Sequence, residues 1–239
     1  NSIHISNGLI LISGPTGSGK TTTIHSLINL MDKKSLKIIT IEDPVERVIP
    51  DVEQIQVNES IGLTFESILR CVLRQDPDVI MVGEIRDEAT AELAVRASLT
   101  GHIIISTLHT NDSISTISRL INLGIEPYLV GSVLKYSIAQ RLVRRLCPEC
   151  KKIVNQKSHI YKAVGCKSCN HTGYKGRTAV SEIFKVDEDL VELISRNESI
   201  STIKKYLVKN KMKFINEDAM LKVKSGETSV EEIKREALV

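Results

Sequence analysis

The sequence predicts an α/β fold, in which a parallel sheet carries a glycine-rich loop and is followed by a cysteine-rich insert and a helical C-terminal region. Three observations lead to this prediction. A glycine-rich loop near the start of the chain lies between an apolar run and a helical pattern. Further short apolar runs, typical of buried strands, alternate with helical patterns along the chain. Two pairs of closely spaced cysteines follow.

The glycine-rich loop, Gly14–Thr21, reads GPTGSGKT and matches the G-x-x-x-x-G-K-[ST] pattern of a P-loop. It follows Leu9–Ile12, an apolar run typical of a buried strand, and precedes a helical pattern. Its glycines allow successive N–H groups to point at one anion, and the N-terminus of the helix adds a positive dipole. We therefore expect phosphate binding here, the alternative being an ordinary glycine turn.

Individual side chains of this loop have expected roles. Lys20 can reach the β- and γ-phosphates of a nucleotide, and the hydroxyl of Thr21 can bind Mg²⁺. The residues expected to contact the nucleotide are Gly14, Pro15, Thr16, Gly17, Ser18, Gly19, Lys20, Thr21 and Thr22. The loop thus predicts a site for a nucleotide with its magnesium ion.

Two further strand patterns end in carboxylates. Lys37–Ile41 is followed by the acidic cluster Glu42–Glu46, and Val79–Val82 is followed by Gly83 and Glu84. Because the carboxyl ends of parallel strands meet at the ligand-binding edge of a sheet, these acids are expected beside the P-loop. Glu84 occupies the place of the second acidic motif of P-loop ATPases, near Mg²⁺. The cluster could hold Mg²⁺ through water or position an attacking water, or it could be a solvated acidic turn.

A third strand pattern, 101–110, has one histidine near each end, His102 and His109. A lone histidine is usually structural. His109, however, follows a strand of the expected nucleotide-binding sheet, where a residue that senses the γ-phosphate would lie. We expect a nucleotide-linked role for both histidines.

The other patterns of residues 1–146 predict one short edge strand, Glu53–Asn58, and four further helices. Thr64 and Asp87 are the expected N-caps of the first two. The third is expected at 112–123, and the fourth, which begins with a proline, at 127–146.

Two features of these helices need an interpretation. Cys71, in the first of them, is expected to be a small core residue rather than a reactive thiol. Arg141, Arg144 and Arg145 are expected on one face near the end of the last helix. They are either a solvated basic face favoured by the helix dipole or side chains that reach a neighbouring subunit.

The clustered cysteines form two C-x₂-C pairs, Cys147 with Cys150 and Cys166 with Cys169, separated by 15 residues. This spacing matches a tetracysteine zinc pattern. Two such knuckles supply a complete tetrahedral shell with no open position, so the zinc ion is expected to be structural. It would stabilise an insert that is too polar to fold alone. Two disulfides or an unoccupied site are the alternatives.

The chain beyond the insert predicts a strand, Thr178–Phe184, and then a series of short amphipathic helices. The helices are expected at 187–195, 201–209, 214–224 and 229–237. Asp187, Ser201 and Ser229 are the expected N-caps. Such helices suit packing or partner binding.

The composition of the 239 residues narrows the class of protein. A hydrophobic content of 41% supports a real core, which must be aliphatic because aromatic residues make up only 3%. A net charge of +3 is too small to indicate nucleic-acid or membrane binding. No apolar run approaches the roughly 18 residues of a membrane span.

Together the motifs resemble the C-terminal ATPase domain of the secretion ATPases that serve type II secretion and type IV pilus assembly, from residue 8 to about residue 225. The matching motifs are the Walker A loop GPTGSGKT at 14–21, the Asp box ITIEDPVE at 39–46, the Walker B stretch DPDVIMVGEIRD at 76–87 and the His box TGHIIISTLHT at 100–110. The tetracysteine insert and GYKGRTAVSEIF at 173–184 are similar to the assembly and export branch rather than the retraction branch.

This resemblance implies a RecA-like fold and a hexameric, Mg²⁺-dependent ATPase that binds ATP near the junctions between domains and subunits. It implies that Glu46 is the general base, that Glu84 is the Walker B acid, and that His102 and His109 are the His-box histidines. A preceding domain, which normally closes on ATP, is expected to supply arginines that this chain does not contain.

The chain is accordingly expected to divide into a RecA-like ATPase core, 1–146, a zinc-binding tetracysteine insert, 147–172, and a C-terminal strand and helical subdomain, 173–239. Because Asn1 lies so close to the first predicted strand, we expect a piece of a longer protein.

The leading functional hypothesis, drawn from the resemblance, is a cytoplasmic motor at the inner face of the cell membrane. It would form a homo-hexamer and push on an inner-membrane platform protein to assemble pilin or pseudopilin fibres for secretion, pili or DNA uptake. One alternative is a RecA-like hexameric nucleic-acid translocase, which the small net charge and few aromatics disfavour. The other is a module that binds nucleotide without hydrolysing it, which the presence of Lys20, Glu46 and Glu84 disfavours.

Overall fold

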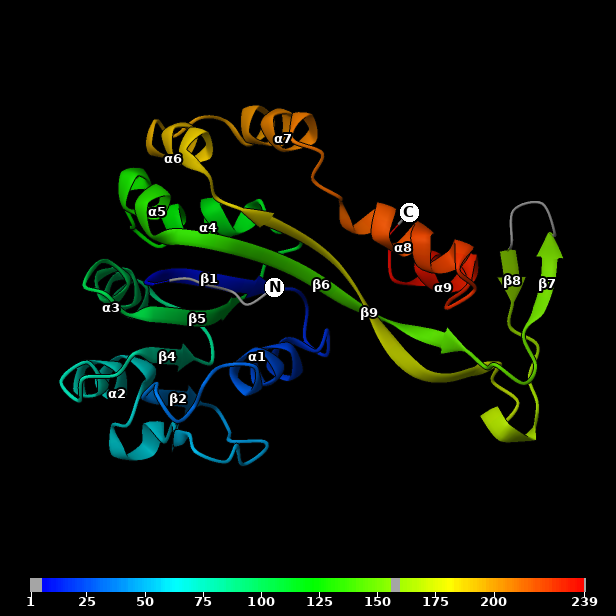
Figure 1. The fold of residues 1–239 in the computed structure, drawn as a ribbon, viewed down its shortest axis with the longest axis horizontal. Coiled ribbons are helices and arrows are strands. Elements are labelled where there is room, and N and C mark those ends of the chain that lie inside the picture. Colours follow the sequence, from blue (N-terminus) through cyan, green and yellow to red (C-terminus); the bar gives the residue numbers. More distant parts are fainter. Residues whose placement is uncertain (1–5, 156–159, 239) are drawn as a thin grey trace.

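The computed structural model describes residues 6–155 and 160–238, and its centre is one seven-stranded sheet (Figure 1). The strands lie in the order β3-β2-β4-β5-β1-β6-β9, and all are parallel to their neighbours except β9, which runs antiparallel to β6. Their bounds are β1 Gly8–Ser13, β2 Ile38–Glu42, β3 Glu53–Gln56, β4 Val79–Val82, β5 Ile103–Leu108, β6 Leu134–Leu146 and β9 Tyr174–Lys185. The predicted α/β fold with a parallel sheet is confirmed, and β3 is an edge strand as predicted.

Helices cover both faces of the sheet because its central strands are apolar on both sides. In β1, Leu9 and Leu11 belong to one hydrophobic core, whereas Ile10 and Ile12 belong to the other. The second core is closed by α1 (Lys20–Asn29). The helices that contribute to the first core are α2 Phe65–Val72, α3 Glu88–Leu99, α4 Ser115–Asn122, α5 Pro127–Val133, α6 Glu188–Ser195 and α7 Ile200–Lys209.

Most of the predicted N-caps are confirmed. The side chains of Thr64, Asp87, Asp187 and Ser229 each accept a hydrogen bond from the backbone N–H three residues later. The predicted cap Ser201 is wrong, because α7 begins at Ile200 and its N-terminus is capped by the side chain of Ser199.

The expectation that Cys71 is a core residue is also wrong, because this cysteine is exposed. The buried residues of α2 are Phe65, Ile68, Leu69 and Val72. Successive helical residues are rotated by about 100°, so position 71 falls outside the stripe that those four residues form.

The segment 127–146 is not one helix. Helix α5 ends after seven residues, and the chain continues as β6, which pairs with β1 on one side and with β9 on the other. The helical pattern arises because a leucine or isoleucine recurs at every fourth position of Leu134–Leu146. A spacing of four keeps side chains on one face of a helix and equally on one face of a strand. Arg141, Arg144 and Arg145 therefore lie along a strand and not at the end of a helix.

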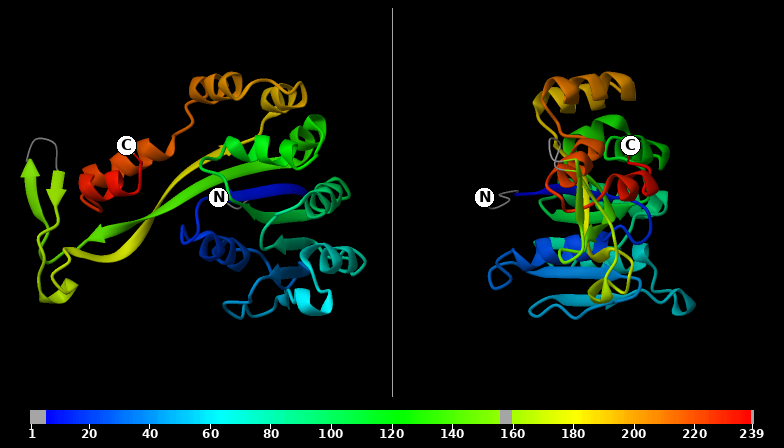
Figure 2. Two further views of the ribbon diagram at one scale, coloured as in Figure 1. Left: turned by 180° about the vertical axis from the view of Figure 1, so that it is seen from behind. Right: turned by 90° about the vertical axis from the view of Figure 1, so that its right-hand side faces the viewer.

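Strands β6 and β9 extend beyond the rest of the sheet as a long ribbon (Figures 1 and 2). The hairpin of β7 (Lys152–Asn155) and β8 (Ile160–Lys162) lies at the tip of this ribbon together with the short helical turn Lys167–Cys169. A second short turn, Glu59–Ile61, follows β3. None of the helices in the described ranges is both long and apolar enough to cross a membrane.

Helices α8 (Ile215–Lys224) and α9 (Val230–Arg235) pack against the ribbon through a small separate core. Its buried members are Val143, Val180, Ala219, Val223, Ile233 and Leu238. The expected division of the chain into 1–146, 147–172 and 173–239 remains a proposal. Strand β9, which opens the third part, is hydrogen-bonded to β6 of the main sheet.

Glu232 attaches α9 to the ribbon through a buried carboxylate that two partly exposed arginines contact. The residue is 1% exposed, and its Oε1 accepts a hydrogen bond from the backbone N–H of Arg144 at 2.9 Å. Its Oε2 accepts from Nε and Nη2 of the same arginine at 3.0 and 2.7 Å, and Arg235 donates to Oε1 at 2.9 Å. Burial acts to raise the pKa of Glu232, but the hydrogen bonds and charge of Arg144 outweigh it and hold the pKa below its ordinary value.

We predict that Glu232→Ala lowers the free energy of unfolding by about 3 kcal/mol, because it removes the carboxylate that a partly buried guanidinium needs. Since folding lowers the pKa of Glu232, its stabilisation is fully present above the ordinary carboxyl pKa and is lost as the pH falls through the lower, folded value. Urea unfolding at neutral and acid pH measures both effects. Glu231→Ala, an exposed change on the same helical turn, should cost less than about 0.5 kcal/mol. Equal losses in the two variants would contradict this role of Glu232.

Candidate nucleotide-binding site

The phosphate-binding loop connects β1 to α1. Gly14, Gly17 and Gly19 have φ values of 145°, 79° and 87°, in the region that favours glycine. Gly19 is the N-cap of α1, and no side chain caps that helix. The backbone N–H groups of the first turn are therefore available to an anion, to which the helix dipole adds attraction.

Lys20 folds back over this loop. Its Nζ donates to the carbonyl oxygens of Gly14 at 2.9 Å and Pro15 at 3.1 Å. Partial burial lowers the pKa of Lys20, and although Glu84 acts to raise it, the result lies below the ordinary value. Charge-assisted bonds to phosphate oxygens would be stronger than bonds to neutral carbonyls, so this ammonium group is well placed for a nucleotide.

A cavity of about 640 Å³ lies beside the loop, at the carboxyl ends of the parallel strands. It brings together most of the predicted site residues: Thr16, Gly17, Ser18, Gly19, Lys20, Thr21, Thr22, Glu46, Glu84 and His109. Gly14 and Pro15 complete the loop itself. The acidic motifs and one histidine thus lie around the P-loop.

His102 lies away from this cavity. Its carbonyl accepts a hydrogen bond from the N–H of Gly8, at the amino end of β1. Its Nδ1 lies 3.0 Å from the carbonyl oxygen of Ala97 and 3.2 Å from Oγ1 of Thr100. Strand β5 lies between the two histidines, so His109 is at the P-loop edge of the sheet and His102 is at the opposite edge. The structure does not bring His102 to the loop.

Glu84 is the centre of a chain of charges on the cavity wall. Its carboxylate is paired with Arg86, and its Oε2 lies 3.3 Å from Nε2 of His109. Arg86 also places Nη2 at 3.5 Å from Oδ2 of Asp43. Partial burial acts to raise the pKa of Glu84, but Arg86 and then His109 outweigh it, so the pKa lies below its ordinary value. This carboxylate is therefore ionised at neutral pH.

The structure separates the two glutamates of the acidic cluster. Glu42 is 2% exposed, and its carboxylate accepts hydrogen bonds from Oγ1 of Thr40 at 2.6 Å and Nε2 of Gln54 at 2.8 Å. It also lies 3.3 Å from Nε2 of His25, on α1. Glu46 is exposed and lines the cavity from the loop after β2. Glu42 is held as part of the wall, whereas Glu46 is accessible to a reacting molecule.

Several residues of the lining were not predicted, among them Phe65, Leu142 and Arg177. Leu142 and Arg177 come from β6 and β9, far along the chain from the P-loop. Leu142 belongs to an ordinary apolar pattern, and Arg177 lies in the stretch GYKGRTAVSEIF, which indicated the branch of the family but no contact with the P-loop. The pairing of β6 with β1 and of β9 with β6 brings Leu142 and Arg177 to the cavity.

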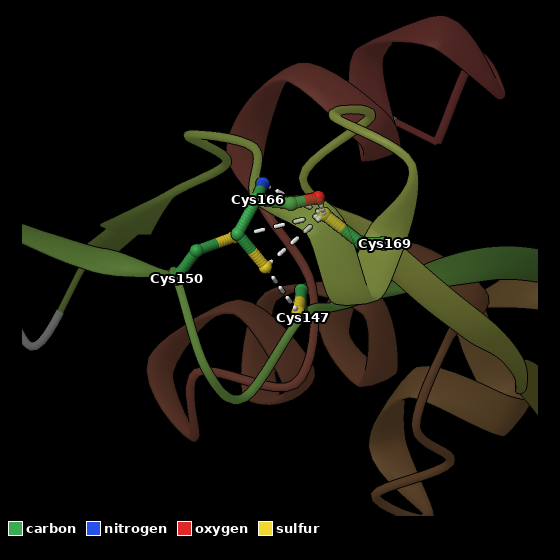
Figure 3. A group of neighbouring side chains, drawn as sticks. All are labelled: Cys147, Cys150, Cys166 and Cys169. Atoms are coloured by element: carbon green, nitrogen blue, oxygen red, sulfur yellow. Dashed lines mark hydrogen bonds between the residues drawn. The ribbon is translucent and has the colours of Figure 1, made fainter.

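The four sulfur atoms of the cysteine pairs converge at the tip of the ribbon (Figure 3). The Sγ atoms of Cys147 and Cys166 are 3.9 Å apart, and Cys169 lies 3.8 Å from both Cys150 and Cys166. These distances are far longer than a disulfide bond, and all four cysteines are free thiols. A tetrahedral zinc site with Zn–S bonds of about 2.3 Å requires sulfur atoms about 3.8 Å apart. The donor set and spacing therefore fit one structural zinc ion.

Backbone amides support the same assignment. The N–H of Gly165 donates to Sγ of Cys150 at 3.3 Å, and the N–H groups of Cys166 and Gly173 donate to Sγ of Cys169 at 3.2 Å. Amide donors stabilise thiolates and orient metal ligands. The alternative of two disulfides does not fit this geometry.

Comparison with known proteins agrees with these observations. A family model described as "Type II/IV secretion system protein" matches residues 1–235. The type II secretion system protein HxcR of Pseudomonas aeruginosa is 45% identical over 98% of this chain and 50% of its own length. The type II secretion system ATPase E of Vibrio cholerae is 45% identical over 96% and 48%, and the type IV pilus assembly ATPase PilB of Myxococcus xanthus is 44% identical over 95% and 43%. The chain spans about half the length of the curated relatives it matches.

Two solved structures have the same arrangement. The pilus retraction motor PilT with bound ADP has a TM-score of 0.77 and 32% identity, covering 97% of this chain and 62% of its own. The ATPase DotB of Legionella pneumophila has a TM-score of 0.77 and 25% identity, covering 99% and 61%. With its P-loop, its acidic strand ends and its match over residues 1–235, the chain belongs to the type II/IV secretion system protein family, whose relatives include named ATPases.

Proposed function

We propose that this chain binds and hydrolyses ATP as the catalytic part of a motor that assembles pilin or pseudopilin fibres. The observation that carries the proposal is the convergence of Lys20, Glu46, Glu84 and His109 on one cavity beside an uncapped helix N-terminus. Phosphoryl transfer needs mainly positioning and charge stabilisation, which this set of groups can supply.

Each group has a role that its position supports. Lys20 and the loop amides would bind the phosphates and stabilise the negative charge that develops on the γ-phosphoryl oxygens. Glu46, exposed at the rim, would orient and deprotonate the attacking water. Glu84 is a poorer base because its ion pair with Arg86 stabilises the charged form. His109, which lies against Glu84, would respond to the presence of a γ-phosphate.

The residues present also fit a magnesium ion. The hydroxyl of Thr21 and the ionised carboxylate of Glu84 are hard oxygen ligands on the same cavity, and Mg²⁺ is usually held by one or two such groups and the phosphates. When bound, the ion would neutralise charge on the β- and γ-oxygens.

The mechanical function is proposed from the relatives. HxcR and ATPase E are named for type II secretion, and PilB is named for type IV pilus assembly. We infer that the chain acts in a homo-hexamer, in the cytoplasm at the inner face of the membrane, on an inner-membrane platform protein. The alternative of a nucleic-acid translocase receives no support, because these relatives are named for other machinery.

We predict that Lys20→Ala lowers ATP turnover by about 10²-fold or more, because it removes the charge that stabilises the transferring phosphoryl group. Phosphate release measured with Mg²⁺ and ATP tests this. Lys34→Ala, an exposed lysine beyond α1, is the control and should leave turnover unchanged. Normal turnover of Lys20→Ala would refute the P-loop assignment.

We predict that Glu46→Gln slows hydrolysis by about 10²- to 10⁴-fold while leaving ATP affinity nearly unchanged, since it removes a general base but no phosphate contact. Glu84→Gln should instead raise the Mg²⁺ concentration that gives the half-maximal rate, which a magnesium titration of the rate measures. If Glu84→Gln alone abolishes hydrolysis at saturating Mg²⁺, the assignment of Glu46 as the base is wrong.

We predict about one zinc ion per chain by metal analysis, because the four thiolates form a closed tetrahedral shell. Cys150→Ser should lower both the zinc content and the melting temperature, and a chelator should lower the melting temperature of the unmodified chain. Cys71→Ser, at an exposed cysteine outside the cluster, should change neither quantity. A metal-free chain that melts at the same temperature with all four cysteines intact would refute the zinc site.

A further inference from the structure

Gln140 is a buried polar residue of β6 whose side chain contacts the phosphate-binding loop and the helix that follows it. The residue is 3% exposed. Its Nε2 donates to the carbonyl oxygen of Ser18 at 2.7 Å, and its Oε1 accepts from Oγ1 of Thr23 at 2.9 Å. The side-chain amide of Gln140 therefore makes one hydrogen bond to the loop, at Ser18, and one to the first turns of α1, at Thr23.

The sheet fixes the position of this amide. Ala139, the preceding residue, is paired with Ser13 at the end of β1, and Gln140 itself is paired with Ser181 of β9. The P-loop packs directly on this part of β6. A Cβ atom on Gly14 would lie 2.5 Å from the carbonyl oxygen of Gln140, and one on Gly19 would lie 3.2 Å from its Nε2. Glycine at both positions permits this approach.

The bond to Ser18 has a consequence for the anion site. In a planar trans peptide the C=O and the following N–H point in opposite directions. Because Gln140 draws the carbonyl of Ser18 toward β6, the N–H of Gly19 is directed away from β6. Gly19 is the N-cap of α1, and it has no side chain that could cap the helix. The side chain of Gln140 thus orients the peptide group between Ser18 and Gly19.

We propose that Gln140 is a positioning residue of the nucleotide site, which sets the direction of the Gly19 amide and thereby the affinity of the loop for a diphosphate. This inference rests on the proposed function and deepens it. Gln140 does not line the cavity, so it acts through the peptide group of Ser18 and Gly19 and through Thr23.

The first test is a titration of the chain with ADP and, separately, with inorganic pyrophosphate. Gln140→Met keeps the volume of the side chain but removes both hydrogen bonds. It should lower the affinity of the chain for ADP and for pyrophosphate about tenfold. Thr228→Val is the matched control, because Thr228 is a buried residue whose Oγ1 donates to the carbonyl of Arg144 on the same strand, far from the loop. It should lower the melting temperature, because it removes one buried hydrogen bond, and leave both affinities unchanged.

A second variant gives a pH signature. In Gln140→Glu the ionised carboxylate still accepts from Thr23 but cannot donate to Ser18, so ADP should bind at least as weakly as to Gln140→Met. When the carboxyl is protonated its O–H can donate to the carbonyl of Ser18. The ADP affinity of Gln140→Glu, relative to the unmodified chain, should therefore recover as the pH falls toward the carboxyl pKa. A purely structural role of Gln140 gives no such recovery.

Thr23→Val provides a variant that leaves Gln140 in place. Alone, this change should weaken the binding of ADP about threefold. In the background of Gln140→Met it should have no further effect, because both changes remove the hydrogen bond between Thr23 and residue 140. If Gln140→Met and Gln140→Glu bind ADP like the unmodified chain while Lys20→Ala does not, the inference fails and the proposed site stands. If the unmodified chain binds neither ADP nor pyrophosphate, the proposed function fails, and this inference fails with it.

Discussion

The pairing of β6 with β1 on one side and with β9 on the other is the interaction on which the rest of the structure depends. The first residues of β6 complete the parallel sheet beside β1, and its middle residues touch the P-loop. Its last residues, up to Leu146, form the ribbon with β9 (Figure 1), and Cys147 follows directly. The cavity beside the P-loop and the cysteine cluster are thus connected by one extended strand.

The charged side chains around the cavity are mostly paired with one another. We therefore expect the affinity for phosphate to depend on direct contacts rather than on the electrostatic field of the whole chain. Arg86 pairs with Glu84 and lies near Asp43, whereas Lys20, which is part of the loop, donates to backbone carbonyls. Burial lowers the pKa of Lys20, and the neutral carbonyls it contacts stabilise its charge only weakly. A bound phosphate would stabilise the charge of Lys20 far more than these carbonyls do. The net charge of +3 on the whole chain agrees with a site that relies on contact rather than on steering.

The sequence predicts the parts of this site that local patterns encode. The P-loop, the acids at the ends of β2 and β4 and the histidine after β5 follow from runs of a few residues, and the parallel sheet gathers them as expected. Strand β6 was missed because a four-residue spacing suits both a strand and a helix. Gln140 could not be predicted, since its partners lie 122 and 117 residues away along the chain and its role exists only once β6 lies beside the P-loop.

One buried carboxylate extends the same connection to the C-terminal helices. Glu182 on β9 is 3% exposed, and its Oε1 accepts from the N–H and Oγ of Ser113 at 2.7 and 2.8 Å. Its Oε2 accepts from the N–H of Ile215, at the start of α8, at 3.1 Å. Ser113 lies in the loop 109–114, which begins at His109 and precedes α4. Because an unpaired buried carboxylate is costly, a rearrangement of that loop must either break the two hydrogen bonds from Ser113 to Glu182 or carry β9 with it. The P-loop, through Gln140, and the histidine loop, through Glu182, are therefore attached to the same ribbon.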